Sequence, residues 1–334
     1  MRGGATLSRE GVRATPSLMY LERQPNFSIG PDDPTSETSG SAPAGGAALV
    51  PQGGLFWDGR ADTLQGQALS PLLDPLEMDG RSVARVAAKL RRAPYADAFT
   101  RLFGAAIVSD ANALVGEALF AVARYQIEDA AFHPYSSKYD AWLEGRARFT
   151  PAELRGYRLF NDPQRANCAA CHLDQPTADG LPPLFTDHQY EALGVPRNRA
   201  LVVNRDPRYY DIGICGPVRT DLGTQHQFCG AFATPTLRNV ATRRAFFHNG
   251  VYRSLRAVMD FYVERDTAPQ RIYPPGPGGR PARFDDLPPA YRANVDVADR
   301  PFGQAPGDAP VLSVSEEEDV IVFLRTLTDG YRGR

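Results

Sequence analysis

The sequence contains little lysine and no long apolar stretch. Of its 37 basic residues only Lys89 and Lys138 are lysine, and the others are arginine. A GC-rich genome is the simpler explanation of this bias; the alternative is that some of the planar guanidinium groups bind anions. With 39 acidic residues the formal charge is −2, which argues against nucleic acid or an anionic membrane as the main partner. No run of about 18 apolar residues occurs, so no membrane span is expected.

The rest of the composition is that of a folded protein. Hydrophobic residues make up 43% and aromatic residues 10% of the 334 positions, which excludes wholesale disorder. The length predicts two domains, each large enough to bury a core. Glycine and proline, with 30 and 29 residues, exceed their usual share and predict long ordered loops.

The first part of the chain changes from loop to helix. Residues 1–56 are rich in Gly, Pro, Ser and Ala, most of all at 31–54, and predict loops with little regular structure. Two helices are predicted after them, and Asp110 is the expected N-cap of the second, longer one. The apolar stripes of these helices are expected to face the core: Val83, Val86, Ala87 and Leu90, then Leu114, Ala118, Val122 and Tyr125.

The second part of the chain contains two helix-start signals. The segment from Thr150 to Glu153 forms a capping box with proline at the first helical position, and its helix is expected to end near Phe160. Residues 266–310 are rich in proline and predict a loop. The segment from Ser315 to Glu318 predicts the start of a last helix, whose apolar face is Val320, Phe323, Leu324 and Leu327. Strand-like alternation is scarce, so we expect a mainly α protein with domains at 1–147 and 148–334.

Cysteine is scarce too, yet two of the four cysteines stand in the segment Cys168-Ala169-Ala170-Cys171-His172. This spacing is the attachment signature of c-type haem. The two thiols each bond to one haem vinyl group, and the adjacent histidine becomes the proximal ligand of the iron. The sequence therefore predicts a covalent haem c at this motif.

A zinc site and a redox dithiol are the alternatives for the same motif. Zinc would need a second, closely spaced ligand pair, whereas Cys215 and Cys229 are far apart in the sequence. A thioredoxin-like dithiol would stand in an α/β pattern, which this sequence lacks. A haem iron also needs a sixth ligand or an open position. Composition alone does not choose among the candidates: His133, His188, His226, His248, Met259 and Tyr262.

Several ordered motifs resemble one known family, the bacterial di-haem cytochrome c peroxidases and their MauG-type relatives. The similarity extends from about Arg13 to the C-terminus. The first-domain motifs are Phe56-Trp57-Asp58-Gly59-Arg60-Ala61, Gln67 and Pro75-Leu76-Glu77-Met78. The second-domain motifs are Cys168-Ala169-Ala170-Cys171-His172, Pro235-Thr236-Leu237-Arg238-Asn239-Val240 and Phe246-Phe247-His248-Asn249-Gly250.

The resemblance implies two cytochrome-c-like helical domains, each with a c-type haem. In this family the second-domain haem passes electrons to a first-domain haem that reduces hydrogen peroxide. Trp57 matches the tryptophan between the haems, and Glu77 matches the acid of the peroxide pocket, with Gln67 as a second polar group. A carboxylate at that place would move a proton between the two peroxide oxygens and so assist O–O cleavage.

The resemblance also assigns a distal ligand to the second haem. The family places it fourteen residues after the histidine matched by His248, which leads to Tyr262 in this chain; Met259, nearly one helical turn away, is the alternative. The ligand is methionine in the peroxidases and tyrosine in MauG-type enzymes. A tyrosinate oxygen favours ferric and higher-valent iron, because a hard anionic ligand stabilises positive charge on the metal.

Further site residues follow from the same resemblance. Arg197 and Arg238 stand in matching motifs and are expected to pair with haem propionates. Family members hold calcium between the domains through an asparagine, but Ala14 occupies that position here, so calcium is doubtful. Cys215 and Cys229 are expected to form a disulfide rather than to stay free, which suits an oxidising compartment.

The sequence departs from the family pattern at its start. The family's first haem motif lies upstream of the segment matched by residues 13–17, and neither that motif nor a signal peptide is visible here. We therefore expect a sequence that begins inside an N-terminally incomplete first domain, with one covalent haem in this chain and a second in the complete protein. A mono-haem protein that evolved by loss is the alternative.

Three functions are compatible with these features. The first is a periplasmic peroxidase that reduces hydrogen peroxide with electrons from a small donor protein such as a cytochrome c or a cupredoxin. The second is a mono-haem electron-transfer module without peroxidase activity. The third is a MauG-type oxidase of a protein substrate, which Tyr262 favours. A homodimer is compatible with each of them.

Overall fold

The fold is mainly helical and has only a few short sheets. The computed structural model describes residues 2–32 and 49–333. In that part of the chain the strands pair antiparallel in twos: β1 (Arg2–Gly3) with β2 (Arg9–Glu10), β3 (Ser28–Pro31) with β4 (Leu49–Gln52), and β5 (Tyr190–Glu191) with β6 (Phe232–Ala233). This confirms the predicted fold class.

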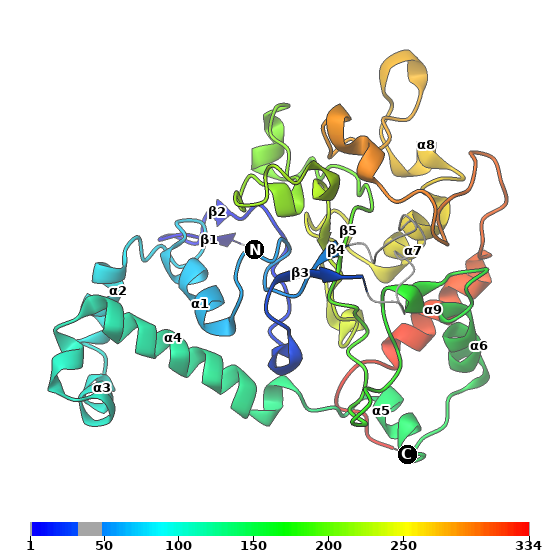
Figure 1. Ribbon diagram of the computed structural model, residues 1–334. Coiled ribbons are helices and arrows are strands. Elements are labelled where there is room, and N and C mark those ends of the chain that lie inside the picture. Colours follow the sequence, from blue (N-terminus) through cyan, green and yellow to red (C-terminus); the bar gives the residue numbers. More distant parts are fainter. Residues whose placement is uncertain (1, 33–48, 334) are drawn as a thin grey trace.

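One group of helices forms the arm on the left of Figure 1. It consists of α1 (Leu64–Leu73), α2 (Val83–Leu90), α3 (Ala96–Phe103) and α4 (Ala111–Glu128). Asp110 caps α4 by accepting hydrogen bonds from the amides of Asn112 and Ala113, as predicted. The small core of this group lies between α1, α2 and α4 and contains Val86, Ala87, Leu114, Val115 and Leu119.

The second group carries the largest core and lies on the right of Figure 1. It consists of α5 (Lys138–Leu143), α6 (Pro151–Phe160), α7 (Leu255–Glu264), α8 (Pro269–Ile272) and α9 (Val314–Arg325). Phe160 of α6 and Phe323 of α9 are fully buried with ring centroids 5.2 Å apart. Tyr139 of α5 packs edge-on against Phe185 in the same core. Thus α5 packs with this group although it precedes the proposed boundary at residue 147.

Two details of the helix predictions were wrong. The last capping box joins Ser313 to Glu316 rather than Ser315 to Glu318, so α9 begins two residues earlier. Several Ser and Glu residues at that point allow either register. In α4 the residues Val122 and Tyr125 are exposed, and Leu119 and Ala123 are buried in their place. Only one side of this long helix packs on α1 and α2, and the apolar residues around its circumference did not identify that side.

The loops contain more structure than predicted. The strands β1 to β4 lie inside residues 1–56; residues 33–48, which fall in the predicted loop, are outside the described residues. The 266–310 segment contains α8 and two short 3-10 turns. Cys215 and Cys229 form the expected disulfide, with Cα atoms 5.1 Å apart. No helix in the described part of the chain is long and apolar enough to cross a membrane.

Candidate functional site

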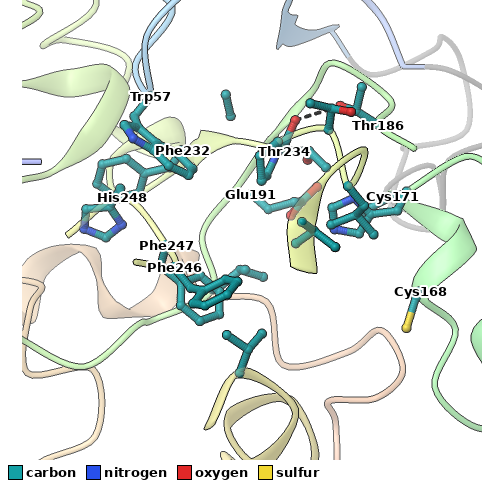
Figure 2. Close-up of a pocket in the computed structure, with 18 of the residues that line it drawn as sticks. Trp57, Cys168, Cys171, Thr186, Glu191, Phe232, Thr234, Phe246, Phe247 and His248 are labelled. Atoms are coloured by element: carbon teal, nitrogen blue, oxygen red, sulfur yellow. Dashed lines mark hydrogen bonds between the residues drawn. The ribbon is translucent and has the colours of Figure 1, made fainter. Parts of the chain in front are cut away.

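A cavity of about 300 Å³ lies beside the Cys-x-x-Cys-His motif. Cys168, Cys171 and His172 line it on one side, and Met259 and Tyr262 reach it from α7. Figure 2 shows the two cysteines on the opposite side of the cavity from Trp57, Phe232 and His248, with Glu191 between them. The cavity therefore brings together residues that are more than 200 positions apart in the sequence, such as Trp57 and Tyr262.

The motif holds its histidine in the state that a metal requires. The 3-10 turn at Cys168–Ala170 is continued by a hydrogen bond from the His172 amide to the Cys168 carbonyl oxygen. His172 Nδ1 lies 2.9 Å from the carbonyl oxygen of Phe185. Burial lowers the pKa of His172 to about 4, although the carbonyl groups of Phe185 and Pro235 act in the opposite direction. The imidazole is therefore neutral at pH 7, and Nε2 is its free ligand atom.

The two motif cysteines are neither disulfide-bonded nor ionised. Burial raises the pKa of the Cys168 thiol to about 12, and that of Cys171 well above its usual value. Such thiols do not suit a redox dithiol, which depends on an accessible thiolate. Within the described residues no three His, Cys, Asp or Glu side chains are grouped so that they could hold a metal ion. Two thiols and a neutral imidazole beside a largely apolar cavity fit a covalent haem c.

The cavity reduces the number of distal-ligand candidates. His133 and His226 do not line it, whereas His188, His248, Met259 and Tyr262 do. The His188 ring lies 3.2 Å from Gln24 Oε1, and His248 stacks on Phe232 with ring centroids 3.5 Å apart.

Met259 and Tyr262 stand nearly one turn apart on α7. Met259 belongs to the buried core around α6 and α9. Burial raises the pKa of Tyr262, and Cys171 and Cys168 act in the same direction; Tyr262 lines the cavity with the motif. Tyr262 therefore stays the preferred candidate, and the assignment stays a prediction.

The three predicted first-domain residues do not all meet at this cavity. Trp57 and Gln67 line it, and the Trp57 indole N–H donates a 2.7 Å hydrogen bond to the Ala14 carbonyl oxygen. Glu77 follows α1, is exposed, and does not line the cavity. Burial of part of its side chain raises the pKa of Glu77, with Asp74 adding to the effect and Arg60 opposing it.

The two predicted propionate partners are engaged elsewhere. Arg238 lines the cavity, but its guanidinium makes a doubly hydrogen-bonded ion pair with Asp140, at 2.8 and 3.0 Å, and donates to the Pro183 carbonyl oxygen. Both partners of this pair are buried. Arg197 does not line the cavity and contacts Asp286 and the Asp206 carbonyl oxygen. Their pairing with propionates stays a prediction.

The place expected for calcium does not offer a set of oxygen ligands. Ala14 has no side-chain oxygen, and its carbonyl oxygen already accepts the Trp57 indole N–H. The next carbonyl oxygen, of Thr15, accepts a 2.5 Å hydrogen bond from Arg243 Nη2. Calcium binds through six to eight oxygens. The residues present here therefore do not fit this ion.

Three cavity residues were not found from the sequence. Glu191 is a buried carboxyl group on β5, whose pKa is raised well above its usual value by burial and by Asp187, Asp296 and Asp299. Phe232 stacks on His248, and Arg243 lines the cavity from the segment after the Pro235–Val240 motif. The spacing of residues in the sequence does not identify them, because they reach the cavity only when distant segments of the chain pack together.

Comparison with known proteins identifies relatives of this chain. The family described as di-haem cytochrome c peroxidase matches residues 3–148. Methylamine utilization protein MauG of Paracoccus denitrificans is 33% identical over 316 residues, which cover 90% of this chain and 77% of that protein. Cytochrome c peroxidase IdrP1 of a Pseudomonas species is 31% identical over 231 residues, which cover 62% of this chain and 55% of that protein.

A solved structure extends the similarity over the described fold. The diheme peroxidase BthA from Burkholderia thailandensis superposes with a TM-score of 0.85 at 38% sequence identity, and the match covers 98% of this chain and 74% of that chain. Relatives named MauG and relatives named cytochrome c peroxidase thus match the same chain. The chain therefore belongs to the di-haem cytochrome c peroxidase and MauG family of peroxidase-like oxidoreductases.

Proposed function

We propose that this chain binds one haem c through Cys168, Cys171 and His172 and acts in the reduction of hydrogen peroxide. The observation that carries the proposal is the cavity itself, which two free thiols, a neutral imidazole and Tyr262 of α7 line together. Bound there, haem c supplies an iron centre that takes up and releases single electrons. The second domain, proposed to span 148–334, is then the electron-transfer unit.

The protein supplies the orientation of this centre. The Phe185 carbonyl oxygen fixes His172 through Nδ1, which directs Nε2 into the cavity. Phe246 and Phe247 contribute aromatic side chains to the cavity (Figure 2) and help to exclude water. Trp57 lines the opposite side with its ring held by the Ala14 carbonyl oxygen, which supports its proposed role in electron transfer between the two domains.

The peroxide chemistry is assigned to the first domain, proposed to span 1–147. Glu77 has a raised pKa and would transfer a proton between the peroxide oxygens, with Gln67 as its polar companion. A second haem in the complete protein is part of this proposal. The electron donor is a small redox protein, such as a cytochrome c or a cupredoxin, and the compartment is the periplasm, where haem c is attached.

The haem content of the chain tests the proposal directly. The chain is produced behind an export signal together with a haem-attachment system, and covalent haem is measured by pyridine haemochrome absorbance and intact mass. One haem per chain is expected, and none in Cys168→Ser/Cys171→Ser. The matched control, Cys215→Ser/Cys229→Ser, removes the other cysteine pair and keeps the haem. A folded chain without covalent haem contradicts the proposal.

A measurement of hydrogen peroxide turnover then distinguishes a peroxidase from an electron-transfer module. Oxidation of a reduced small cytochrome by hydrogen peroxide is expected from the complete protein carrying two haems, and loss of this activity in Glu77→Gln. A complete protein that carries one haem and exchanges electrons without peroxide turnover would support the mono-haem electron-transfer alternative. Tyr262 favours a second candidate, the MauG-type oxidation of a protein substrate, because an anionic oxygen ligand stabilises iron above the ferrous state.

A further inference from the structure

One arginine at the cavity has a half-buried guanidinium group without a carboxylate partner. Three arginines line the cavity within the described residues: Arg238, Arg243 and Arg300. Asp140 and the Pro183 carbonyl oxygen satisfy Arg238, and Arg300 is exposed. Arg243 makes its hydrogen bond through Nη2 to the Thr15 carbonyl oxygen, and no acidic side chain pairs with it in the part of the chain that the structure describes.

The position of this charge is costly unless an anion compensates it. Burial lowers the pKa of Arg243, and no carboxylate opposes that effect. A buried guanidinium is normally paired, because desolvation of an unpaired charge exceeds what one neutral hydrogen bond returns. The Thr15 carbonyl oxygen takes one of the two Nη2 protons. Nε, Nη1 and the other Nη2 proton remain as donors to an anion.

Five acidic residues line the cavity in the described part of the chain. Two of them, Asp211 and Asp286, are paired with Arg13 and Arg197. Glu191, Asp296 and Asp299 form an acidic group, and Arg300 is next to Asp299 in the sequence. Arg238 and Arg243 form a basic group and also line a smaller surface cleft. Asp329 lines this cleft as well and accepts hydrogen bonds from Tyr20 and Asn239. A haem carries two propionates, and their negative charges disfavour the acidic group. The arginine group is therefore where the carboxylates are expected.

We propose that Arg243 is the cationic partner of a propionate of the haem c bound at Cys168 and Cys171, and that it links this propionate to the Thr15 backbone. The inference rests on the proposed function, since it requires a haem in the cavity. It assigns propionate pairing to a residue outside the matched sequence motifs. It also makes Arg243 a positioning residue that joins the haem to the segment carrying Ala14, which holds Trp57.

The reduction potential of the haem tests this pairing without any turnover. Removing the positive charge in Arg243→Gln leaves the propionate charge uncompensated, which stabilises the ferric state. The ratio of ferrous to ferric haem at a fixed potential is expected to fall about tenfold, which is a midpoint lowered by about 59 mV for one electron. Arg243→Lys keeps the charge and is expected to recover most of the shift. The matched control is Arg244→Gln, at the exposed neighbouring arginine, which leaves the midpoint unchanged.

A second measurement covers the case in which Arg243→Gln does not fold. In Arg243→Lys the fork of the guanidinium is lost, so the propionate-bending band in the resonance Raman spectrum is expected to move, whereas Arg244→Lys leaves it in place. An unchanged midpoint in Arg243→Gln, or an unchanged band in Arg243→Lys, overturns the inference. If the wild-type chain attaches no haem, the proposed function itself is contradicted. The haem-content assay detects that result independently of the Arg243 variants.

Discussion

At the scale of single residues, Tyr262 is the side chain whose assignment has the largest chemical consequence. It lines the cavity together with the motif histidine; the alternative ligand Met259 also lines the cavity and belongs to the buried core. Tyr262→Phe removes the only oxygen of this side chain, so the ferric absorption spectrum is expected to change and the midpoint potential to rise. The rise follows because the lost phenolate oxygen stabilises ferric iron. Spectroelectrochemistry of the haem-loaded protein measures both effects.

The matched control for this prediction stands one turn away on the same helix. Met259→Leu conserves the volume of a core side chain and removes the thioether sulfur. If Tyr262 is the ligand, this variant keeps the wild-type spectrum. A wild-type spectrum in Tyr262→Phe together with a changed spectrum in Met259→Leu would reverse the assignment.

The sequence predicted residues of the site where local spacing carries the chemistry. Cys168, Cys171 and His172 are fixed by the distances between two thioether bonds and one iron ligand, so their pattern is visible without a fold. Glu191 and Arg243 depend on which loops meet around the cavity, and residue spacing holds no information on that. For Arg238 the motif points to an anion site, and the structure shows its guanidinium paired with Asp140; pairing with a propionate stays a prediction.

At the scale of elements, the close approach of α6 to α9 depends on one glycine. A Cβ atom added at Gly156 would lie 2.0 Å from the Asp319 carbonyl oxygen and 2.9 Å from Phe323 Cβ. Gly156→Ala therefore forces the two helices apart, and we expect the free energy of unfolding to fall by about 1–3 kcal/mol. Urea denaturation of the haem-loaded protein measures this change.

Gly116 in α4 provides the control for that substitution. A Cβ atom added there meets nothing within 4 Å in the described part of the chain. Gly116→Ala is expected to raise the free energy of unfolding by about 0.5–1 kcal/mol, because alanine loses less backbone entropy in a helix. Equal effects at the two glycines would show that α6 and α9 are not packed as closely as described.

Helix starts were more predictable than helix faces. The caps at Asp110 and Thr150 are local hydrogen bonds between residues two or three positions apart, so the sequence alone contains them. The buried face of α4 depends on where α1 and α2 pack, which is tertiary information, and the prediction for Val122 and Tyr125 was wrong for that reason. The short strands β1 to β6 were not predicted, because pairs of two to four residues leave no periodic signal.

At the scale of the whole molecule, a buried network of charges joins the first sixty residues to the middle of the chain. Asp58 is completely buried and pairs with Arg13 Nη1 at 2.7 Å and with Arg60 Nη1 at 2.8 Å. Arg13 also binds both carboxylate oxygens of Asp211, at 2.6 and 2.7 Å. Burial alone would lower the pKa of Arg13, but Asp211 and Asp58 raise it above its usual value. Arg219 adds a hydrogen bond to the Asp58 carbonyl oxygen.

Asp58 follows Trp57 directly in the sequence, and Arg13 connects it to Asp211, so loss of this network is expected to weaken the contact between these two parts of the chain. Asp58→Asn leaves two guanidinium groups short of a buried negative charge, and the expected loss is about 3–5 kcal/mol in the free energy of unfolding. Differential scanning calorimetry should show a lower midpoint and a broadened or divided transition. The same substitution at the exposed pair of Asp206 and Arg208, Asp206→Asn, is the control and leaves the transition unchanged. A single, unshifted transition in Asp58→Asn would show that the Arg13 network does not couple the two parts.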